Sequence, residues 1–256
     1  MLIVDRQQRV LDTLREQQSV QLEDLAQQLN VSVSTIRRDL EALERRGLVA
    51  RTHGGAVYRG EQAAPKQSAV ALNQRMSEHA EQKQAIGAAA AAMVLPHMTV
   101  LLDGGSTVIY TAQQISARPI QVVTNSLAIG NLFADDDKVE LLLVGGSLYP
   151  RTGVCVGPIA TGCLADLHAD MCFFSVAGVY GDEAFNINLT MAQVEQVMMQ
   201  QAAHSVLLMD SSKFGRKSLV RVCGLGELDA IITDAAIESA WPERLGQRLV
   251  VAGRAT

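Results

Sequence analysis

The sequence of 256 residues predicts a small domain of three helices and a β-hairpin, followed by a larger α/β domain with a mostly parallel sheet. Residues 1–58 show helical spacing of apolar residues, and two short β-rich runs around a glycine turn follow. Beyond residue 99, continuous apolar runs alternate with helical stretches, as buried parallel strands and their connecting helices do. The polar, proline-containing stretch 59–66 is expected to be a linker, so the second domain is expected to span 67–256.

Three helices are expected in the first domain. The first two are predicted over "RQQRVLDTLREQQ" and "SVQLEDLAQQLN", the second ending at Asn30. The third, "VSVSTIRRDLEALERRG", starts at a Ser32 cap and ends at Gly47. Only three residues separate the second helix from the third, which is the helix-turn-helix arrangement. Strands at 48–52 and 56–58, around the turn His53-Gly54-Gly55, add a wing.

Charge is distributed unevenly along the chain. The formal net charge is −5, but residues 1–60 hold nine Arg, no Lys and eight acidic residues, a net charge of +1. Within them, residues 33–59 carry six Arg and His53 against three acids. Nucleic-acid binding depends on a local basic patch, so the acidity of the whole chain does not exclude it.

The third helix separates its side chains into two faces. Val33, Ile36, Leu40 and Leu43 are expected to pack on the other helices, because a helix turns by about 100° per residue. The opposite face carries Ser34, Arg37, Arg38, Glu41 and Arg45, whose first members would reach base edges in DNA. The predicted DNA-binding residues are Ser32, Ser34, Thr35, Arg37, Arg38, Arg51 and His53. In the alternative interpretation the arginines are solvated and pair with Asp39, Glu41 and Glu44.

This region resembles a known family. The stretch "VSVSTIRRDLEALERRGLVARTHGGAV" is similar, without a gap, to the DNA-binding domain of the DeoR family of bacterial transcription regulators. The resemblance implies binding to double-stranded operator DNA.

In the second domain, "SAVALNQRMSEHAEQKQAIGAAAAAMV" predicts one long helix that runs on to Pro96. The apolar runs "TVLLD", "IQVVT", "VELLLVGG", "CFFSVAG", "SVLLMD" and "AIITD" predict buried parallel strands. Helices are expected between them at 107–116, 126–134 and 190–203, on both faces of the sheet.

Polar and glycine clusters follow several of these strands. Ligands of such sheets bind at the carboxyl ends of the strands, where glycines allow close approach and free backbone N–H groups favour an anion. Lys213 in "MDSSKFG" adds a cation suited to a phosphate. The predicted effector-binding residues are Asp103, Gly104, Gly105, Ser106, Thr107, Thr124, Asn125, Ser126, Gly145, Gly146 and Lys213. Any one such glycine turn alone often binds nothing.

The same clusters resemble, in order, the DeoR effector domain, a sugar-phosphate sensor related in fold to ribose-5-phosphate isomerase. The resemblance covers about residues 3 to 235. It implies that 104–107 bind the phosphate, that 124–126 line the sugar pocket and that Lys213 joins them. The chain departs from the family at Gly104, where a serine hydroxyl is lost, and at Val179, where relatives carry an acid. Met191 stands near an expected Glu, and Glu195 follows four residues later.

Two functions are weighed. The first is a DNA-binding regulator, expected to be a repressor of carbohydrate genes that a phosphorylated sugar releases from DNA; activation is the other possible direction. The second is a sugar-phosphate isomerase-like enzyme with an accessory DNA-binding domain. Val179 removes the obvious catalytic acid, leaving Asp103, Asp182 and Glu183 as weak substitutes. We therefore expect no catalytic residues.

Assembly and location follow from the same interpretation. Helix-turn-helix proteins bind paired half-sites, so a homo-oligomer, dimer or tetramer, is expected. The run "AIGAAAAAMVLPHMTVLL" is interrupted by Pro96 and His97, and the start of the chain has no signal core, so no membrane partner and a cytoplasmic location are expected. The four cysteines show no zinc spacing and are expected to be reduced and mostly buried; neither a metal nor a cofactor is expected.

Overall fold

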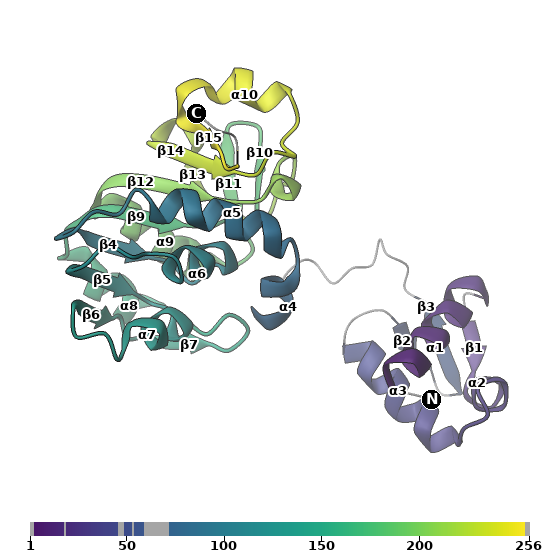
Figure 1. The fold of residues 1–256 in the computed structure, drawn as a ribbon. Coiled ribbons are helices and arrows are strands. Elements are labelled where there is room, and N and C mark those ends of the chain that lie inside the picture. The colour runs from purple at the N-terminus through teal and green to yellow at the C-terminus, as the bar shows by residue number, and fades with distance from the viewer. Residues whose placement is uncertain (1–2, 18, 46–48, 53, 59–71, 254–256) are drawn as a thin grey trace. The chain divides into compact units, whose positions relative to one another are not determined.

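The computed structural model describes residues 3–17, 19–45, 49–52, 54–58 and 72–253. The chain forms two compact units, Met1–Ala69 and Val70–Thr256, and each is described by itself (Figure 1). The predicted linker, 59–66, lies outside the described residues.

The first unit contains the expected three helices and wing. Its elements are α1 (Ile3–Gln17), β1 (Ser19–Gln21), α2 (Leu22–Gln28), α3 (Val33–Arg45), β2 (Val49–Arg51) and β3 (Gly55–Tyr58). Side chains from all three helices, among them Val10, Leu25, Ile36, Leu40 and Leu43, form one buried core. The inward face predicted for the third helix is therefore confirmed.

One part of this unit differs from the expectation. Residues 19–21 were predicted as part of the second helix, but they form β1, which pairs antiparallel with β3 and gives a three-stranded sheet in the order β1-β3-β2. The reason is the burial of Val20, whose β-branched side chain joins the core from a strand.

The helix-turn-helix junction is as expected. Asn30 has a left-handed φ of 52°, which ends α2, because asparagine tolerates this conformation better than most residues. The Ser32 Oγ accepts a hydrogen bond from the backbone N–H of Thr35 at 3.2 Å, so Ser32 caps α3.

The second unit is built on a seven-stranded sheet in which every pair of neighbouring strands is parallel. In spatial order the strands are β15 (Leu249–Val251), β14 (Ala230–Thr233), β12 (Ala202–Leu208), β9 (Ala169–Phe174), β4 (Thr99–Leu102), β5 (Ile120–Thr124) and β6 (Val139–Leu143). All six apolar runs predicted as strands lie in this sheet, which confirms the fold class. The strand β15 was not predicted.

Helices cover both faces of the sheet (Figure 1). Buried side chains of α5 (Ala80–Ala91), α6 (Ser106–Ala112) and α7 (Leu127–Phe133) form a core on one face. Those of α8 (Pro158–Ala165), α9 (Leu189–Gln200) and α10 (Ala240–Leu245) form a core on the other. Three predicted helices correspond to α6, α7 and α9.

Short strands complete the unit. A hairpin pairs β7 (Ser147–Tyr149) with β8 (Val154–Val156). A small antiparallel sheet joins β10 (Gly178–Tyr180), β11 (Glu183–Asn186) and β13 (Val220–Gly224). A short 3-10 helix, η2 (Ser211–Lys213), follows β12.

The expectation of a single long helix before Pro96 is wrong. The chain forms α4 (Leu72–Ser77) and then α5, with His79 between them at a left-handed φ of 52°. A physical reason is the buried Lys83, whose Nζ donates hydrogen bonds to the backbone carbonyl oxygens of Arg75 and Glu78. Carbonyls near the end of α4 thus have a cation as their partner, and the helix does not need to continue.

Two smaller expectations also have an outcome. All four cysteines are free, and Cys155, Cys172 and Cys223 are buried, as expected. Across the described ranges, no helix combines the length and apolar character that crossing a bilayer requires.

Candidate functional site

The outward face of α3 presents Ser34, Arg37 and Arg38 as exposed side chains. Asp39, one of the proposed partners of the arginines in the solvated interpretation, is instead buried at 2% exposure. Its carboxylate accepts a hydrogen bond from Arg6 Nε at 2.5 Å and one from Gln7 Nε2 at 3.2 Å, both from α1. Asp39 therefore fixes α3 to α1 and does not neutralise the exposed arginines.

Three hydroxyl groups gather at the start of α3. Ser32 Oγ lies 2.9 Å from Ser34 Oγ and 2.8 Å from Thr35 Oγ1. Such a cluster at the N-terminal turn of a helix suits contact with a phosphate oxygen. Of the predicted wing residues, Arg51 lies in β2, and His53 lies outside the described residues.

In the second unit, Asp103, Gly104 and Gly105 form a tight loop between β4 and α6. The buried Asp103 carboxylate accepts a hydrogen bond from the backbone N–H of Gly105 at 3.0 Å. A Cβ at Gly104 would lie 2.1 Å from Val154 Cγ1, and one at Gly105 would lie 2.7 Å from Ser175 Cβ. Both positions require glycine because neighbouring side chains pack directly on the backbone.

The residues that follow β5 have divided roles. Thr124 Oγ1 donates to the carbonyl of Leu102 at 2.7 Å, and Ser126 Oγ accepts from the N–H of Ile129 as the cap of α7. Asn125 Nδ2 donates to the carbonyl of Cys155 at 2.9 Å. Within the described residues, the Asn125 Oδ1 and the Thr107 Oγ1 are buried without a hydrogen-bond partner. Two buried oxygens near the glycine loop are therefore available to a ligand.

Lys213 lies at the same end of the sheet. Its Nζ donates to Ser175 Oγ at 2.9 Å, and Ser175 follows β9 and packs beside Gly105. Burial lowers the pKa of Lys213 to about 8, against the raising effect of the Asp210 charge, and the charges of Arg75 and Lys83 lower it further. Burial alone would raise the pKa of Asp210, but the charge of Lys213 and a hydrogen bond from Ser212 hold it below its ordinary value. The Gly104–Thr107 loop, Asn125 and Lys213 thus belong to one cluster.

Sequence reasoning missed several members of this cluster. Arg75 of α4 is close enough to Asp103 for its charge to act on that carboxyl, whose pKa burial raises overall. The other missed members are Lys83, Ser175, Asn186 and Glu195. They come from α5, the end of β9, β11 and α9. Of these, only Glu195 had a sequence signal, its displacement from the position that the family resemblance suggested.

Among the described residues, no contact links Gly145 or Gly146 to this cluster. Both are exposed after β6. Gly146 has a φ of 148°, and a Cβ there would lie 2.8 Å from the carbonyl oxygen of Val156 and 3.2 Å from Ala160 Cβ. Gly146 therefore allows close packing against the start of α8.

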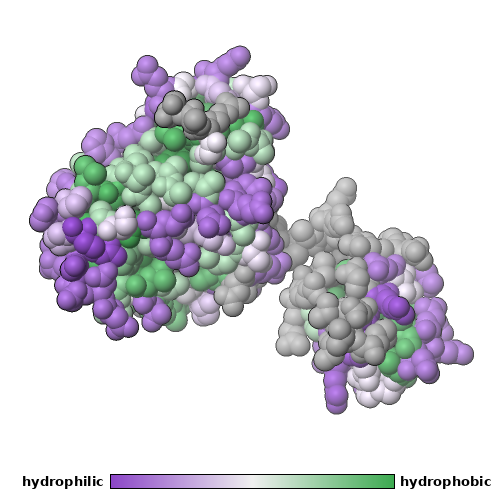
Figure 2. Space-filling model, viewed as in Figure 1, coloured by the Kyte–Doolittle hydropathy of each residue, from purple (hydrophilic) through white to green (hydrophobic). Residues whose placement is uncertain are grey.

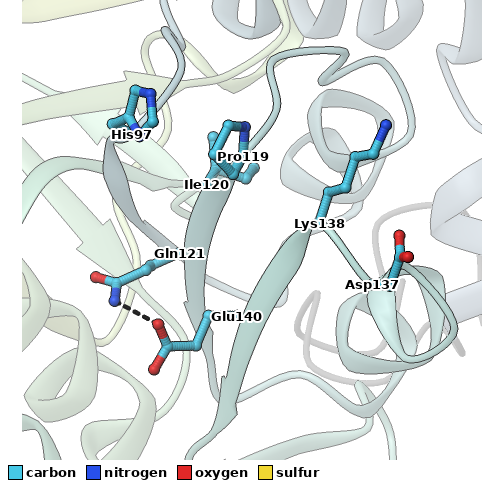
Figure 3. A pocket seen from close by; sticks show the side chains of 7 residues that line it. All are labelled: His97, Pro119, Ile120, Gln121, Asp137, Lys138 and Glu140. Carbon is cyan, nitrogen blue, oxygen red and sulfur yellow. Dashed lines mark hydrogen bonds between the residues drawn. The ribbon is translucent and has the colours of Figure 1, made fainter.

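A surface hollow of about 400 Å³ lies at the end of the sheet where the strands β5 and β6 begin (Figure 3). Its lining includes Ile120 at the start of β5 and Lys138, which directly precedes β6. Gln121 Nε2 donates to Glu140 Oε2 at 2.6 Å across these two strands, as Figure 3 shows. Because the strands are parallel, this hollow lies opposite the carboxyl ends that carry the cluster.

Two of the three acids considered for catalysis are engaged elsewhere. Asp182 forms an ion pair with Arg244 at 2.9 Å, and Glu183 one with Arg221 at 2.8 Å. Val179 is buried in the core. Neither Asp182 nor Glu183 is a free acid at the glycine loop.

A small domain with an exposed basic helix, together with an α/β sheet unit that carries a polar cluster at its strand ends, is the arrangement expected of a ligand-sensing DNA-binding regulator. Residues 6–62 match the DeoR-like helix-turn-helix domain, and residues 78–235 match the DeoR C terminal sensor domain. The chain belongs to the DeoR family of transcription regulators.

Curated relatives agree with this assignment. The chain is 35% identical to the L-fucose operon activator of Escherichia coli (strain K12), over 90% of this chain and 94% of the relative. It is 28% identical to the HTH-type transcriptional regulator GolR of Listeria innocua, over 94% of each chain. It is 29% identical to the HTH-type transcriptional repressor GlcR of Bacillus subtilis, over 92% of this chain and 90% of the relative. All three relatives are named as regulators of transcription.

Among solved structures, ribose 5-phosphate isomerase A of Methanocaldococcus jannaschii aligns with 53% of this chain and 55% of its own, at 17% identity and a TM-score of 0.39.

Proposed function

We propose that this regulator represses carbohydrate genes and that a phosphorylated sugar, bound at the cluster in the second unit, releases it from operator DNA. The name of the L-fucose operon activator supports a carbohydrate operon as the target, and the name of the repressor GlcR supports repression. A reporter gene under the operator should be less active when the protein is present; higher activity would make the protein an activator.

The DNA interface of the proposal is the outward face of α3 and the wing. Arg37 and Arg38 are exposed, and the buried Asp39 is occupied by Arg6. The positive charges of Arg37 and Arg38 are therefore available to phosphates and to guanine edges. The hydroxyls of Ser32, Ser34 and Thr35 would position the helix start on the DNA backbone. Arg51 and His53 remain predicted contacts of the wing.

The single observation that carries the effector proposal is a pair of buried oxygens, Thr107 Oγ1 and Asn125 Oδ1, that have no hydrogen-bond partner among the described residues. They lie at the same end of the sheet as the cation Lys213. Leaving a buried polar atom unpaired costs about 1–3 kcal/mol, so both atoms favour a ligand that supplies partners. The amide oxygen of Asn125 only accepts hydrogen bonds, and sugar hydroxyl groups donate them. Lys213 and the backbone of the glycine loop suit the phosphate.

Assembly and organisation complete the proposal. A homodimer or tetramer would supply two helix-turn-helix units for paired half-sites. In α5, Ala88 is exposed and Ala85 and Ala89 are partly exposed, and Figure 2 shows a weakly hydrophobic area over this helix, which is one candidate for self-association. The proposed limits are 1–58 for the DNA-binding domain, 59–66 for the linker and 67–256 for the effector domain. The proposed location is the cytoplasm, where operator DNA is accessible.

A thermal-shift screen tests the effector part directly. A ligand that binds only the folded state raises the melting temperature with its concentration. At least one phosphorylated sugar should stabilise the wild-type protein, and Lys213→Met should weaken that stabilisation. Lys138→Met is the matched control, because it replaces an exposed lysine at the opposite end of the strands, and it should respond like wild type. Unphosphorylated sugars that stabilise equally well would contradict the role of Lys213.

A further inference from the structure

Glu195 is a buried acid that the fold itself does not explain. It lies on α9 with 1% of its surface exposed. Its Oε1 accepts a hydrogen bond from Asn186 Nδ2 at 2.5 Å. Its Oε2 is buried and has no hydrogen-bond partner in the described part of the chain. Because burying an unpaired polar atom is costly, this oxygen requires a reason outside the packing of the domain.

Asn186 holds Glu195 in one orientation. The Asn186 Oδ1 accepts a hydrogen bond from the backbone N–H of Ile187 at 2.7 Å, which fixes the amide plane. The Nδ2 group is then aimed at Glu195 Oε1, and the second oxygen of the carboxyl group is left open. The pair is therefore preorganised, as a recognition group should be.

Glu195 lies close enough to three charged members of the effector cluster, Asp103, Lys213 and Arg75, for their charges to act on its carboxyl group. Burial raises the pKa of Glu195 well above its ordinary value, and the negative charge of Asp103 raises it further. The hydrogen bond from Asn186 and the charges of Lys213 and Arg75 oppose this rise without reversing it. Burial therefore favours the neutral form of the carboxyl group, which has one O–H donor as well as acceptor capacity.

A neutral acid is suited to a different part of the ligand from a cation. A phosphate is attracted by Lys213 and would gain little from a neutral carboxyl group. A hydroxyl or carbonyl oxygen on the carbon chain, in contrast, can accept the O–H of Glu195 without any charge to compensate. Sites that hydrogen-bond a substrate oxygen discriminate strongly against analogues that lack it.

We propose that Glu195, oriented by Asn186, binds an oxygen on the carbon chain of the phosphorylated sugar and so determines which sugar the protein senses. This inference rests on the proposed function and adds a specificity determinant to it. The phosphate itself is bound by Lys213 and the glycine loop.

The test compares Glu195→Gln with Glu195→Met by calorimetric titration. Glutamine keeps one donor and one acceptor in nearly the same place, whereas methionine keeps the volume and removes both. The probes are inorganic phosphate, ribose 5-phosphate, glucose 6-phosphate, fructose 6-phosphate and fructose 1-phosphate. Circular dichroism and melting temperature establish that each variant is folded, and Glu195→Leu replaces the methionine variant if that one does not fold.

The expected result separates the two parts of the ligand. All folded variants should bind inorganic phosphate like wild type. The preferred sugar phosphate of the wild-type protein should bind about tenfold or more weakly to Glu195→Met, and its advantage over the other sugars should disappear, because a lost hydrogen bond to a buried group is of that size. Glu195→Gln should retain the wild-type order of preference.

Two results would overturn the inference, and they differ from failure of the proposed function. An unchanged preference in Glu195→Met would show that Glu195 does not read the sugar. Equal wild-type affinity for phosphate and every sugar phosphate would show that there is no selectivity for Glu195 to provide. If the wild-type protein binds none of the probes, the proposed effector site itself is wrong, and the inference is rejected with it.

Discussion

Replacing Arg37 and Arg38 by alanine tests the recognition helix. Both side chains are exposed, and no hydrogen bond or ion pair to either is found in the described residues. Their loss should therefore leave the free energy of unfolding within about 0.5 kcal/mol of wild type. An arginine that reads guanine contributes about 1–3 kcal/mol to DNA binding. Because a dimer carries each arginine twice, one such substitution should cost about 2–6 kcal/mol per bound dimer.

The assay is fluorescence anisotropy with an operator selected from a random DNA pool, between about 50 and 200 mM salt. An arginine that contacts only a phosphate should instead lower the slope of log affinity against log salt by about one per contact. Arg9→Ala, an exposed arginine of α1 outside the helix-turn-helix, is the charge-matched control and should have a smaller effect. Wild-type affinity and an unchanged salt slope in the double variant would refute the assignment of α3.

Further predictions concern the second unit and assembly. Effector affinity should fall about tenfold as the pH rises through about 8, because Lys213 then loses its proton and with it the positive charge that attracts the phosphate. Affinity titrations at pH 7 and pH 9.5 measure this fall, which Lys213→Met should not show. Lys83→Met should lower the free energy of unfolding by about 2–4 kcal/mol in urea, since two partly buried backbone carbonyls lose their donor while the cost of a buried charge is relieved. Lys138→Met is the control, and a urea midpoint of Lys83→Met equal to that of the wild-type protein would contradict this prediction. Gly105→Asp should abolish the effector response, which a DNA titration with ligand measures. Because its Cβ would lie 2.7 Å from Ser175 Cβ, the substitution should also lower the free energy of unfolding by about 1–3 kcal/mol, which thermal melting measures. Light scattering should give at least a dimer at micromolar concentration, and a monomer with and without DNA would contradict this.

Local patterns predicted much of the fold. The two faces of α3 follow from helical geometry, which depends only on the spacing of Ile36, Leu40 and Leu43 along the chain. The strand-end position of the glycine loop and of Asn125 follows from the rule that parallel strands end at one edge.

The remaining features depend on contacts between distant segments. Lys83 interrupts a helix that its own sequence would continue, because it binds carbonyls of Arg75 and Glu78. Asp39 is paired with Arg6, 33 residues away, although acids and arginines closer in sequence suggested another pairing. Glu195 is 92 residues from Asp103 (195 minus 103), so no local pattern could place both at one site.

The central claim is that ligand binding in the second unit changes the DNA affinity of the first. The most direct test is an operator titration of the wild-type protein with and without the phosphorylated sugar that stabilises it most. An effector acts only through different affinities for the free and DNA-bound states, so the apparent Kd should rise by about 5- to 150-fold with the sugar phosphate. It should not change with the unphosphorylated sugar. An operator affinity that the bound sugar phosphate leaves unaltered would contradict the account.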